Sequence, residues 1–525
     1  ERTRNAARPP SRTSSQRFMW RSLIAPRAAR AFSSAALATP PTPTATRLII
    51  DGKIVDSLAG NQLPTVDPRF GTPICNVAAA DEADVDKAVA AARRAFDEGP
   101  WPKMSGRERS RILHKFADLL EAHSEELALL ETLDNGKPLS FARAADMPLV
   151  VDHFRYFAGW ADKIHGETIP VDGDYLVYSL REPVGVVGAI IPWNFPLLMA
   201  AWKLAPALAS GCSVVLKVAE QTPLTGLRAG ELALEAGIPP GVLNVINGSG
   251  EVAGAALARH PAVDKVAFTG STEVGKAVMA AASHNLARVS LELGGKSAAI
   301  VCEDAHLDTA VEQTHFALFF NHGQCCTAGS RLFVHEKIYD QFVERVVARA
   351  NEAKVGDPFD SSVDQGPQVS EEQFSKIMSY IDSGKAEGAS LCTGGQRVGN
   401  SGYFIKPTVF ADVQDGMKIA REEIFGPVMS ILKYSSYDEV LQRANATNYG
   451  LAAGVWTESA QTANTLSRGL RAGTVWVNCY DVFDAAMPFG GFKQSGIGRD
   501  KGKAALDNFT ETKVICQPLV NAAWK

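Results

Sequence analysis

The sequence predicts an α/β protein organised around a doubly wound parallel sheet. Short apolar runs rich in Val, Ile and Leu alternate with helical segments between residues 184 and 293, and the pattern starts again near residue 298. Runs of this length fit buried strands, and helices between buried strands imply right-handed crossovers to parallel neighbours. The 525 residues suffice for about two or three domains.

Two helical regions precede the first strand run. Residues 81–98 are expected to form a helix that begins after Asp81, since Val89 and its periodic neighbours lie on one face. Residues 105–135 form a second amphipathic helical region, with Phe116 on its apolar stripe.

The strand run then defines two α/β units. The expected strands of the first unit are 184–191, 213–217, 242–246, 263–268 and 289–293. Its expected helices include 199–209 and 224–235, the second of which can end at Gly237. The second unit starts near Lys296, with a helix at 339–353 and strands at 298–301, 331–334, 409, 429–432, 454–456 and 474–477.

Residues 1–46 have a different composition from the rest of the chain. No acidic residue occurs between Glu1 and Asp51, while arginine, serine and alanine recur. An Arg-rich, Ser-rich and acid-poor leader is typical of an organelle transit peptide. We therefore expect an address in the mitochondrial matrix, with a plastid as the alternative destination and a disordered basic tail as the alternative structure.

Charge and cysteine content narrow the class of partners. The net charge is −5, from 53 basic and 58 acidic residues, so neither nucleic acid nor an anionic membrane is an expected partner. No apolar run reaches the about 18 residues of a membrane span. Eight cysteines without regular spacing predict free thiols in a reducing compartment and no metal site.

The segment that contains Cys325 and Cys326 is the strongest candidate for chemistry. The two adjacent cysteines lie between Gly323 and Gly329, whereas structural cysteines usually occur singly and zinc ligands in spaced pairs. A tight loop presenting a thiol fits this pattern. Upstream, Glu292 offers a carboxylate beside another glycine pair, so Cys326 is the candidate nucleophile and Glu292 the candidate base.

The segment GSTEVGKA at residues 270–277 follows an expected strand and opens a helix, a placement that suits phosphate binding. It departs from a P-loop because Ala277 stands where Ser or Thr would hold magnesium, and its spacing departs from the Rossmann G-x-G-x-x-G. A structural turn, a dinucleotide site and a nucleotide triphosphate site all stay open.

Three polar residues lie at strand ends. Lys217 and Glu220 follow the strand at 213–217, where a carboxylate can accept hydrogen bonds from ribose hydroxyls, although a solvated charge pair is the alternative. Asn194 lies in a Pro-rich strand-to-helix connection and can donate to an oxyanion, although asparagine in turns is usually structural.

Six motifs make the chain resemble the aldehyde dehydrogenase superfamily, and closely its mitochondrial tetrameric branch, over residues 47–525. They are PWNFP at 192–196, FTGSTEVG at 268–275, LELGGKS at 291–297, GQCC at 323–326, EEIFGPV at 422–428 and PFGGFKQSG at 488–496. The resemblance implies a Rossmann-like NAD-binding domain, an α/β catalytic domain and a small β oligomerisation arm.

The resemblance also implies the domain borders. The NAD-binding domain takes residues 47–164 and 184–294, the catalytic domain 295–495, and the arm 165–183 and 510–525. It implies a homotetramer assembled as a dimer of dimers.

The implied reaction is the oxidation of small aliphatic or aromatic aldehydes, such as acetaldehyde, to carboxylic acids with NAD. Cys326 forms a thiohemiacetal and then a thioester, Asn194 and the Cys326 N–H hold the oxyanion, and Glu292 activates the hydrolytic water. A betaine-aldehyde dehydrogenase and a semialdehyde dehydrogenase of the same superfamily are the alternatives, and Thr327, at a position that varies in the family, leaves substrate preference open.

The resemblance places further residues at the two ligands. The expected NAD contacts are Ile190, Ile191, Pro192, Trp193, Lys217, Glu220, Gly250, Gly270, Ser271, Gly275, Leu293, Gln373, Glu423 and Phe425. The expected substrate tunnel is lined by Phe195, Met199, Trp202, Phe320, Cys325, Thr327, Phe483 and Phe489.

Overall fold

Strands rich in β-branched residues form a first sheet in the computed structural model, which describes residues 38–520. The strands are β1 (Leu48–Ile50), β2 (Lys53–Val55), β7 (Val186–Ile190), β8 (Ser213–Lys217), β9 (Leu243–Ile246), β10 (Lys265–Thr269), β11 (Arg288–Glu292) and β19 (Gly496–Ile497). Their order across the sheet is β19-β11-β10-β7-β8-β9-β1-β2. The parallel strands β7 to β11 thus follow the third-second-first-fourth-fifth order of a doubly wound nucleotide-binding fold.

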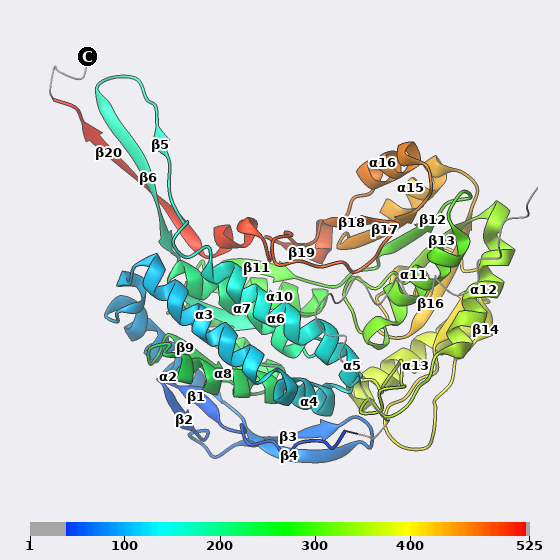
Figure 1. Cartoon of the computed structure of the whole chain (residues 1–525), viewed down its shortest axis with the longest axis horizontal. Helices are drawn as coiled ribbons and strands as arrows, with labels where there is room; N and C mark the ends of the chain where they lie inside the picture. The colour runs from blue at the N-terminus through cyan, green and yellow to red at the C-terminus, as the bar shows by residue number, and fades with distance from the viewer. Residues whose placement is uncertain (1–37, 521–525) are drawn as a thin grey trace, which may run out of the picture. The chain divides into compact units, whose positions relative to one another are not determined.

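Helices cover both faces of this sheet, as Figure 1 shows. They are α2 (Glu82–Asp97), α3 (Gly106–Ala122), α4 (Ser124–Asn135), α5 (Leu139–Phe141), α6 (Met147–Ala158), α7 (Pro196–Ser210), α8 (Leu224–Ala236), α9 (Ala255–Arg259) and α10 (Thr272–Ala282). Alternate residues of β7 divide between two cores: Val187 and Ala189 pack with α3, α6, α7 and α8, whereas Val186 and Ile190 pack with α2, α9 and α10. This division confirms the predicted doubly wound architecture.

A second parallel sheet follows in the chain. Its strands are β12 (Ala298–Val301), β13 (Arg331–His335), β14 (Ser390–Thr393), β15 (Thr408–Ala411), β16 (Val428–Tyr434), β17 (Ala452–Trp456) and β18 (Thr474–Val477), in the order β14-β15-β16-β13-β12-β17-β18. Only β14 runs antiparallel to its neighbour within this described sheet. Its helices are α11 (Leu307–Phe319), α12 (Tyr339–Glu352), α13 (Glu371–Ala386), α14 (Lys418–Arg421), α15 (Tyr437–Asn445) and α16 (Ala460–Gly469).

Two smaller antiparallel sheets complete the described fold. The strands β5 (Thr168–Ile169), β6 (Tyr175–Pro183) and β20 (Thr510–Pro518) form a sheet that extends away from the two large sheets in Figure 1. We call it the arm. The hairpin β3 (Gln62–Asp67) and β4 (Thr72–Ala78) forms the other sheet.

Several sequence predictions change in detail. The expected helical region at 105–135 divides at His123 into α3 and α4, and β1 to β4 were not foreseen. Asp81 caps α2 as expected, with its side chain accepting from the N–H groups of Ala83 and Asp84. The leader expected at 1–46 lies outside the described residues as far as residue 37, and the arm's last residues, 521–525, also lie outside them.

The far end of the second unit returns to the first sheet. Strand β19 pairs antiparallel with β11, and its Gly496 lies opposite Glu292. Residues near the C-terminal end of the chain therefore lie beside the strand that ends in Glu292, the candidate base. Within residues 38–520, no helix has the length and apolarity needed to cross a membrane.

Candidate active site

The candidate site forms where three neighbouring strands of the first sheet end. Ile190 at the end of β7 is in register with Phe268 of β10, and Thr269 of β10 is in register with Glu292 of β11. Parallel strands end at one edge of a sheet, and the gap between the first and fourth strands in chain order is the usual ligand crevice. The sheet thus brings the loops after β7, β10 and β11 together.

The loop after β7 holds Asn194 in a network of amide groups. Asn194 is buried, and its Nδ2 donates to the backbone oxygen of Gln324 at 3.0 Å, which leaves its second N–H for another acceptor. Asn321 donates through Nδ2 to the Asn194 backbone oxygen at 2.9 Å. Asn135 donates through Nδ2 to the Trp193 oxygen at 2.7 Å. Hydrogen bonds to its side chain and to the backbone around it therefore hold Asn194, the candidate oxyanion donor, in place.

The loop before Cys326 has an unusual backbone. Asn321 and His322 have φ values of 48° and 60°, a region that residues other than glycine seldom adopt and that persists only where the surroundings hold it. His322 Nε2 accepts from the Gly366 N–H at 3.1 Å, and Gln324 Oε1 accepts from the Val369 N–H at 3.1 Å. These bonds hold a strained turn that presents Cys326, which is partly exposed.

Two glycines let the Glu292 segment and the Cys326 loop approach each other. A Cβ atom at Gly295 would lie 2.6 Å from the Cys326 backbone oxygen, closer than real Cβ contacts allow. A Cβ atom at Gly490 would lie 2.7 Å from Glu292 Oε1. Gly295 therefore lets the segment after Glu292 pack against the Cys326 backbone, and Gly490 leaves room for the Glu292 carboxyl.

The Cys326 thiol and the Glu292 carboxyl both favour their protonated forms. The hydrogen bond with Cys325 and then burial raise the pKa of the Cys326 thiol well above its ordinary value. Burial, followed by the charge of Asp500, raises the pKa of Glu292 well above its ordinary value. A carboxyl group with a raised pKa is a stronger proton acceptor once ionised, which suits it to a thiol that does not ionise readily.

The loop after β10 combines tight packing with a helix start. The Ser271 side chain accepts from the Val274 N–H at 3.2 Å and caps α10. A Cβ atom at Gly275 would lie 2.5 Å from Leu293 Cδ2, so glycine is required where α10 meets the residue after Glu292. The N-terminus of a helix at a strand edge favours an anion.

The predicted ribose residues form a connected group beside this loop. Lys217 Nζ lies 2.8 Å from Glu220 Oε2, and Glu220 Oε1 accepts from the Gly250 N–H at 3.4 Å. Burial would raise the pKa of Glu220, but the charge and hydrogen bond of Lys217 outweigh it and lower the pKa. An ionised carboxylate at this edge can accept hydrogen bonds from a ribose.

The remaining predicted cofactor residues meet across the two large sheets. Glu423 Oε1 accepts from the Gly295 N–H at 2.9 Å, and burial raises the Glu423 pKa to about 7. Gln373 Nε2 donates to the Phe425 oxygen at 2.8 Å, and the Phe425 ring meets the Trp193 ring edge-on at 5.2 Å. Buried neighbours at the same edge are Ile190, Ile191 and Leu293, and Pro192 precedes Trp193.

The predicted tunnel residues form two aromatic groups. Phe195 and Phe320 have ring centres 6.0 Å apart. Trp202, Phe483 and Phe489 form a closed triangle with ring centres 5.1 to 6.3 Å apart, which we call the aromatic triangle. Phe195, Met199 and Trp202 recur at helical spacing at the start of α7, so one face of this helix serves both groups.

Thr327 and Cys325 belong to a separate polar chain beside Cys326. Cys325 Sγ lies 3.0 Å from Thr327 Oγ1, and this hydroxyl donates to Asp481 Oδ1 at 2.8 Å. Burial raises the Asp481 pKa to about 7. Tyr480 donates to the Thr327 backbone oxygen at 2.6 Å, which anchors the residue after the nucleophile.

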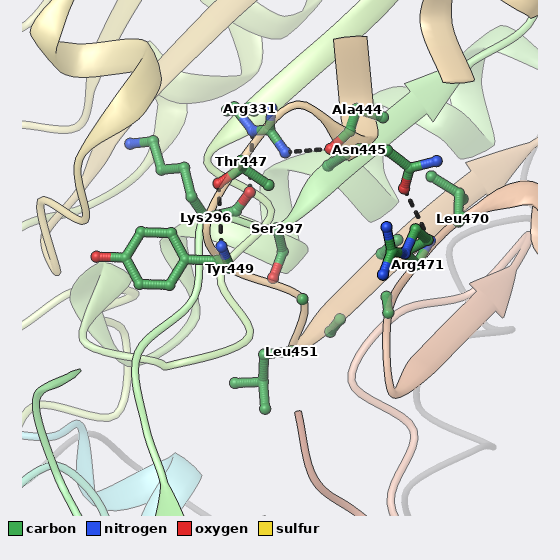
Figure 2. Close-up of a pocket in the computed structure, with 15 residues that line it drawn as sticks. Lys296, Ser297, Arg331, Ala444, Asn445, Thr447, Tyr449, Leu451, Leu470 and Arg471 are labelled. Carbon is green, nitrogen blue, oxygen red and sulfur yellow. Dashed lines mark hydrogen bonds between the residues drawn. The ribbon is translucent and has the colours of Figure 1, made fainter. Parts of the chain in front are cut away.

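A small cavity is lined by Lys296, Ser297, Ala298, Arg331, Ala444, Asn445, Thr447 and residues 449–453 and 470–472 (Figure 2). Arg331 donates to the Ala444 backbone oxygen at 2.8 Å, and the Arg471 N–H donates to Asn445 Oδ1 at 2.8 Å. The cavity of about 20 Å³ has room for a water molecule. Neither Cys326, Glu292 nor Asn194 lines it, so it is not the place of the reaction.

Residues 54–515 match the model of the aldehyde dehydrogenase family. The chain belongs to this family. The match covers well over half of the sequence and includes each strand end described above. Members of this family are oxidoreductases that act on aldehydes and use NAD as their cofactor.

Named relatives extend over nearly the whole chain. Aldehyde dehydrogenase family 2 member B4, mitochondrial, from Arabidopsis thaliana is 61% identical over 91% of this chain and 89% of its own length. The mitochondrial aldehyde dehydrogenase of Homo sapiens is 58% identical over 93% and 96%. The solved NAD+ complex of an aldehyde dehydrogenase from Bacillus cereus has a TM-score of 0.89 and 50% identity over 90% and 96%.

Sequence reasoning missed two charged residues of this aldehyde dehydrogenase. Lys203 and Asp500 form a fully buried ion pair, and the charge of Asp500 acts on Glu292. Lys203 could have been found from the sequence, because it is the single charged residue in the otherwise apolar helix α7. Nothing in the sequence marks Asp500, because it lies 297 positions away from its partner Lys203.

Proposed function

We propose that this aldehyde dehydrogenase oxidises small uncharged aldehydes to carboxylic acids through a thioester on Cys326. The observation that carries the proposal is the packing of Gly295 against the Cys326 carbonyl, which sets the Glu292 segment beside the thiol loop. A nucleophile and a base on separate segments need such a fixed approach to act together.

Cys326 attacks the aldehyde carbonyl as a thiolate, forming the C–S bond of a thiohemiacetal. Because its thiol pKa is raised, the proton must leave to a base, and Glu292 is the acceptor. The free N–H of the Asn194 amide and the Cys326 backbone N–H donate to the oxyanion. The amide network with Gln324 and Asn321 holds this donor before substrate binds.

The residues at the strand edge fit NAD. Lys217 and Glu220 suit the adenosine ribose, the Gly270 loop with the α10 N-terminus suits the pyrophosphate, and Glu423 with Phe425 suits the nicotinamide end. An ionised carboxylate at Glu220 repels a 2′-phosphate, which favours NAD over NADP. NAD held by these residues would supply the acceptor for the hydride of the thiohemiacetal carbon.

Glu292 then decides the product. It first releases the thiol proton to solvent; as a carboxylate it then takes a proton from water, the water oxygen attacks the thioester carbonyl, and the C–S bond breaks to release the acid and the Cys326 thiolate. A semialdehyde dehydrogenase that transfers its acyl group to CoA would not need this base. The buried Glu292 carboxyl, held at the Gly490 backbone, therefore supports hydrolysis.

The test is a steady-state comparison with purified protein. We expect NADH and acetate from acetaldehyde in equal amounts, and no acetyl-CoA when CoA is added. Acyl-CoA as the main product would replace the hydrolytic proposal by CoA acylation, and no NADH from any aldehyde would end it.

The proposal also includes the localisation of the protein, its assembly and its domain borders. The acid-poor, Arg-rich sequence of residues 1–46 and the mitochondrial names of the relatives support an address in the mitochondrial matrix. The arm, with its exposed strand edges, supports assembly into a homotetramer. The domain borders at residues 164, 184, 294 and 495 belong to the same proposal, with the arm separating the two halves of the NAD-binding domain.

A further inference from the structure

Lys501 is enclosed by the aromatic triangle. Its Nζ lies 4.5 Å from the ring centre of Phe483, 4.8 Å from that of Trp202 and 5.7 Å from that of Phe489. Only 1% of Lys501 is exposed, so the ammonium group is held among the rings and away from solvent. Three aromatic faces around one cation are the arrangement that binds quaternary ammonium ligands in other proteins.

The charge of Lys501 has no direct counter-ion. The adjacent carboxylate of Asp500 is already paired with Lys203. Within residues 38–520, Lys501 forms no salt bridge, and the carboxylates of Asp484, Asp500 and Glu292 attract it only from farther away. A cation without a counter-ion acts strongly on any second charge in a site of low dielectric constant.

The other titratable group at the triangle adds no positive charge. His153 stacks on Trp202 with ring centres 5.9 Å apart. Burial, and then the charge of Lys501, lowers the His153 pKa to about 3, so this imidazole is neutral at physiological pH. Lys501 is thus the cation that faces the triangle.

The backbone at Lys501 and at the residue after it has an uncommon conformation. Lys501 has a φ of 61°, which a residue other than glycine seldom adopts, and Gly502 follows with a φ of 58°. A Cβ atom at Gly502 would lie 2.7 Å from the Ala486 backbone oxygen, in the segment that joins Phe483 to Phe489. The turn therefore packs against the same segment that supplies two of the rings.

We propose that Lys501 is a specificity-determining residue that fills the cation position of the aromatic triangle with the protein's own ammonium group. The site then rejects aldehydes that carry a quaternary ammonium group and accepts uncharged or anionic ones. This inference rests on the proposed function, in which the triangle lines the path of the aldehyde, and it selects against the betaine-aldehyde alternative.

The test uses two aldehydes of nearly identical shape. In 3,3-dimethylbutanal a carbon atom bears the three methyl groups, and in betaine aldehyde a positively charged nitrogen atom bears them. The measured quantity is the ratio of kcat/KM for the neutral aldehyde to kcat/KM for the cationic one. Because both react through the same chemistry, the ratio cancels effects on Cys326 and Glu292.

We expect the wild-type enzyme to favour the neutral aldehyde by about tenfold or more below pH 8. K501M, which keeps the length and apolar stem, should lower the ratio by about tenfold, because the triangle becomes free to hold the ammonium. K501R keeps the charge and should keep the ratio. Burial lowers the Lys501 pKa to about 8, so the wild-type ratio should also fall as the pH rises through 8.

The outcomes separate the inference from the proposed function. If the wild-type enzyme oxidises neither these two aldehydes nor acetaldehyde, the proposed function fails. If it oxidises the neutral aldehyde and K501M leaves the ratio unchanged, or K501R lowers the ratio as K501M does, the inference is overturned. Thermal unfolding and NAD binding check that K501M folds, and if it does not, a wild-type ratio that stays flat through pH 8 overturns the inference by itself.

Discussion

At the residue scale, Cys326 and Glu292 depend on each other because both pKa values are raised. A thiol with a raised pKa supplies little thiolate at neutral pH, so its reactivity requires a base that can take the proton. Glu292 is such a base because its own raised pKa brings proton transfer between the two groups closer to balance. We propose that the two residues act as one unit.

Replacing Cys326 by Ser should abolish NADH production, since a serine hydroxyl is far harder to ionise than a thiol. NAD binding should persist, because the proposed cofactor residues Lys217, Glu220 and Glu423 are untouched. Absorbance at the NADH band and quenching of protein fluorescence by NAD measure the two properties. Near-normal NADH production would contradict the role of Cys326.

Glu292→Gln should lower kcat by at least about tenfold, since positioned acid–base groups typically contribute about 10² to 10⁴. In the wild-type enzyme kcat should rise with pH through the raised Glu292 pKa, because only the carboxylate accepts a proton. The variant should lack that rise. A pH profile of kcat checks this, and an unchanged rise in the variant would assign it to another group.

The sequence predicts roles for these residues because each has a local signal. Adjacent cysteines between glycines mark Cys326, and a glycine pair marks Glu292. The Lys203–Asp500 pair and the support of Asn194 by Asn135 and Asn321 had no such signal. They join segments far apart in the chain, and spacing in a sequence does not encode long-range contacts.

At the element scale, helix α4 ends in a turn that supports the Asn194 loop. Lys137 follows this turn, fully buried, in ion pairs with Glu131 and Asp146, and its Nζ lies 4.1 Å from the Phe195 ring centre. Asn135, two residues earlier, bonds to the Trp193 oxygen. The same turn thus contacts residues on both sides of the candidate oxyanion donor.

Lys137→Met should destabilise the protein by about 3–5 kcal/mol, because two carboxylates stay buried without their cation. Burial already raises the Glu131 pKa to about 8, against the pull of Lys137. A folded-state pKa above the ordinary 4.5 means that stability is lost as pH rises through it. The cost should therefore shrink as the pH falls from about 8, and urea unfolding across pH measures it.

Lys337→Met is the matched control. Lys337 pairs with Glu303 on the surface, with 66% of its side chain exposed, so solvent screens the pair and its removal should change stability far less. Equal losses in the two variants would contradict the importance of burial at Lys137.

The elements themselves were predicted unevenly. The strands of both parallel sheets matched their apolar runs within a few residues, because a buried strand is a continuous hydrophobic segment. Short strands at or next to a sheet edge, such as β1, β2 and β14, were missed because they are brief or partly exposed. The break between α3 and α4 was missed because the apolar pattern continues through His123.

At the scale of the whole molecule, the arm is the part whose proposed role depends on other copies of the chain. Strand β20 pairs with β6 over residues 510–518, and β5 and β20 form the two outer edges of this described sheet. Its exposed apolar side chains include Tyr175, Leu180 and Val514. Exposed edges and apolar side chains of this kind mark an association surface.

Removing residues 510–525 should convert the proposed tetramer into smaller species, while the two parallel sheets stay folded. Light scattering coupled to size-exclusion chromatography gives the mass, and circular dichroism checks the fold. An unchanged mass, or a full-length protein that is already monomeric, would contradict the assignment of the arm to assembly.

The account as a whole is tested most directly by trapping the acyl group. Wild-type enzyme is mixed with acetaldehyde and NAD, quenched with acid within the first turnover, digested and sequenced by mass spectrometry. We predict an acetyl group on Cys326 that accumulates with NADH, requires NAD and is absent from Cys326→Ala enzyme. An acetyl group on Cys325 instead, or NADH formed with no acylated cysteine, would contradict the central claim.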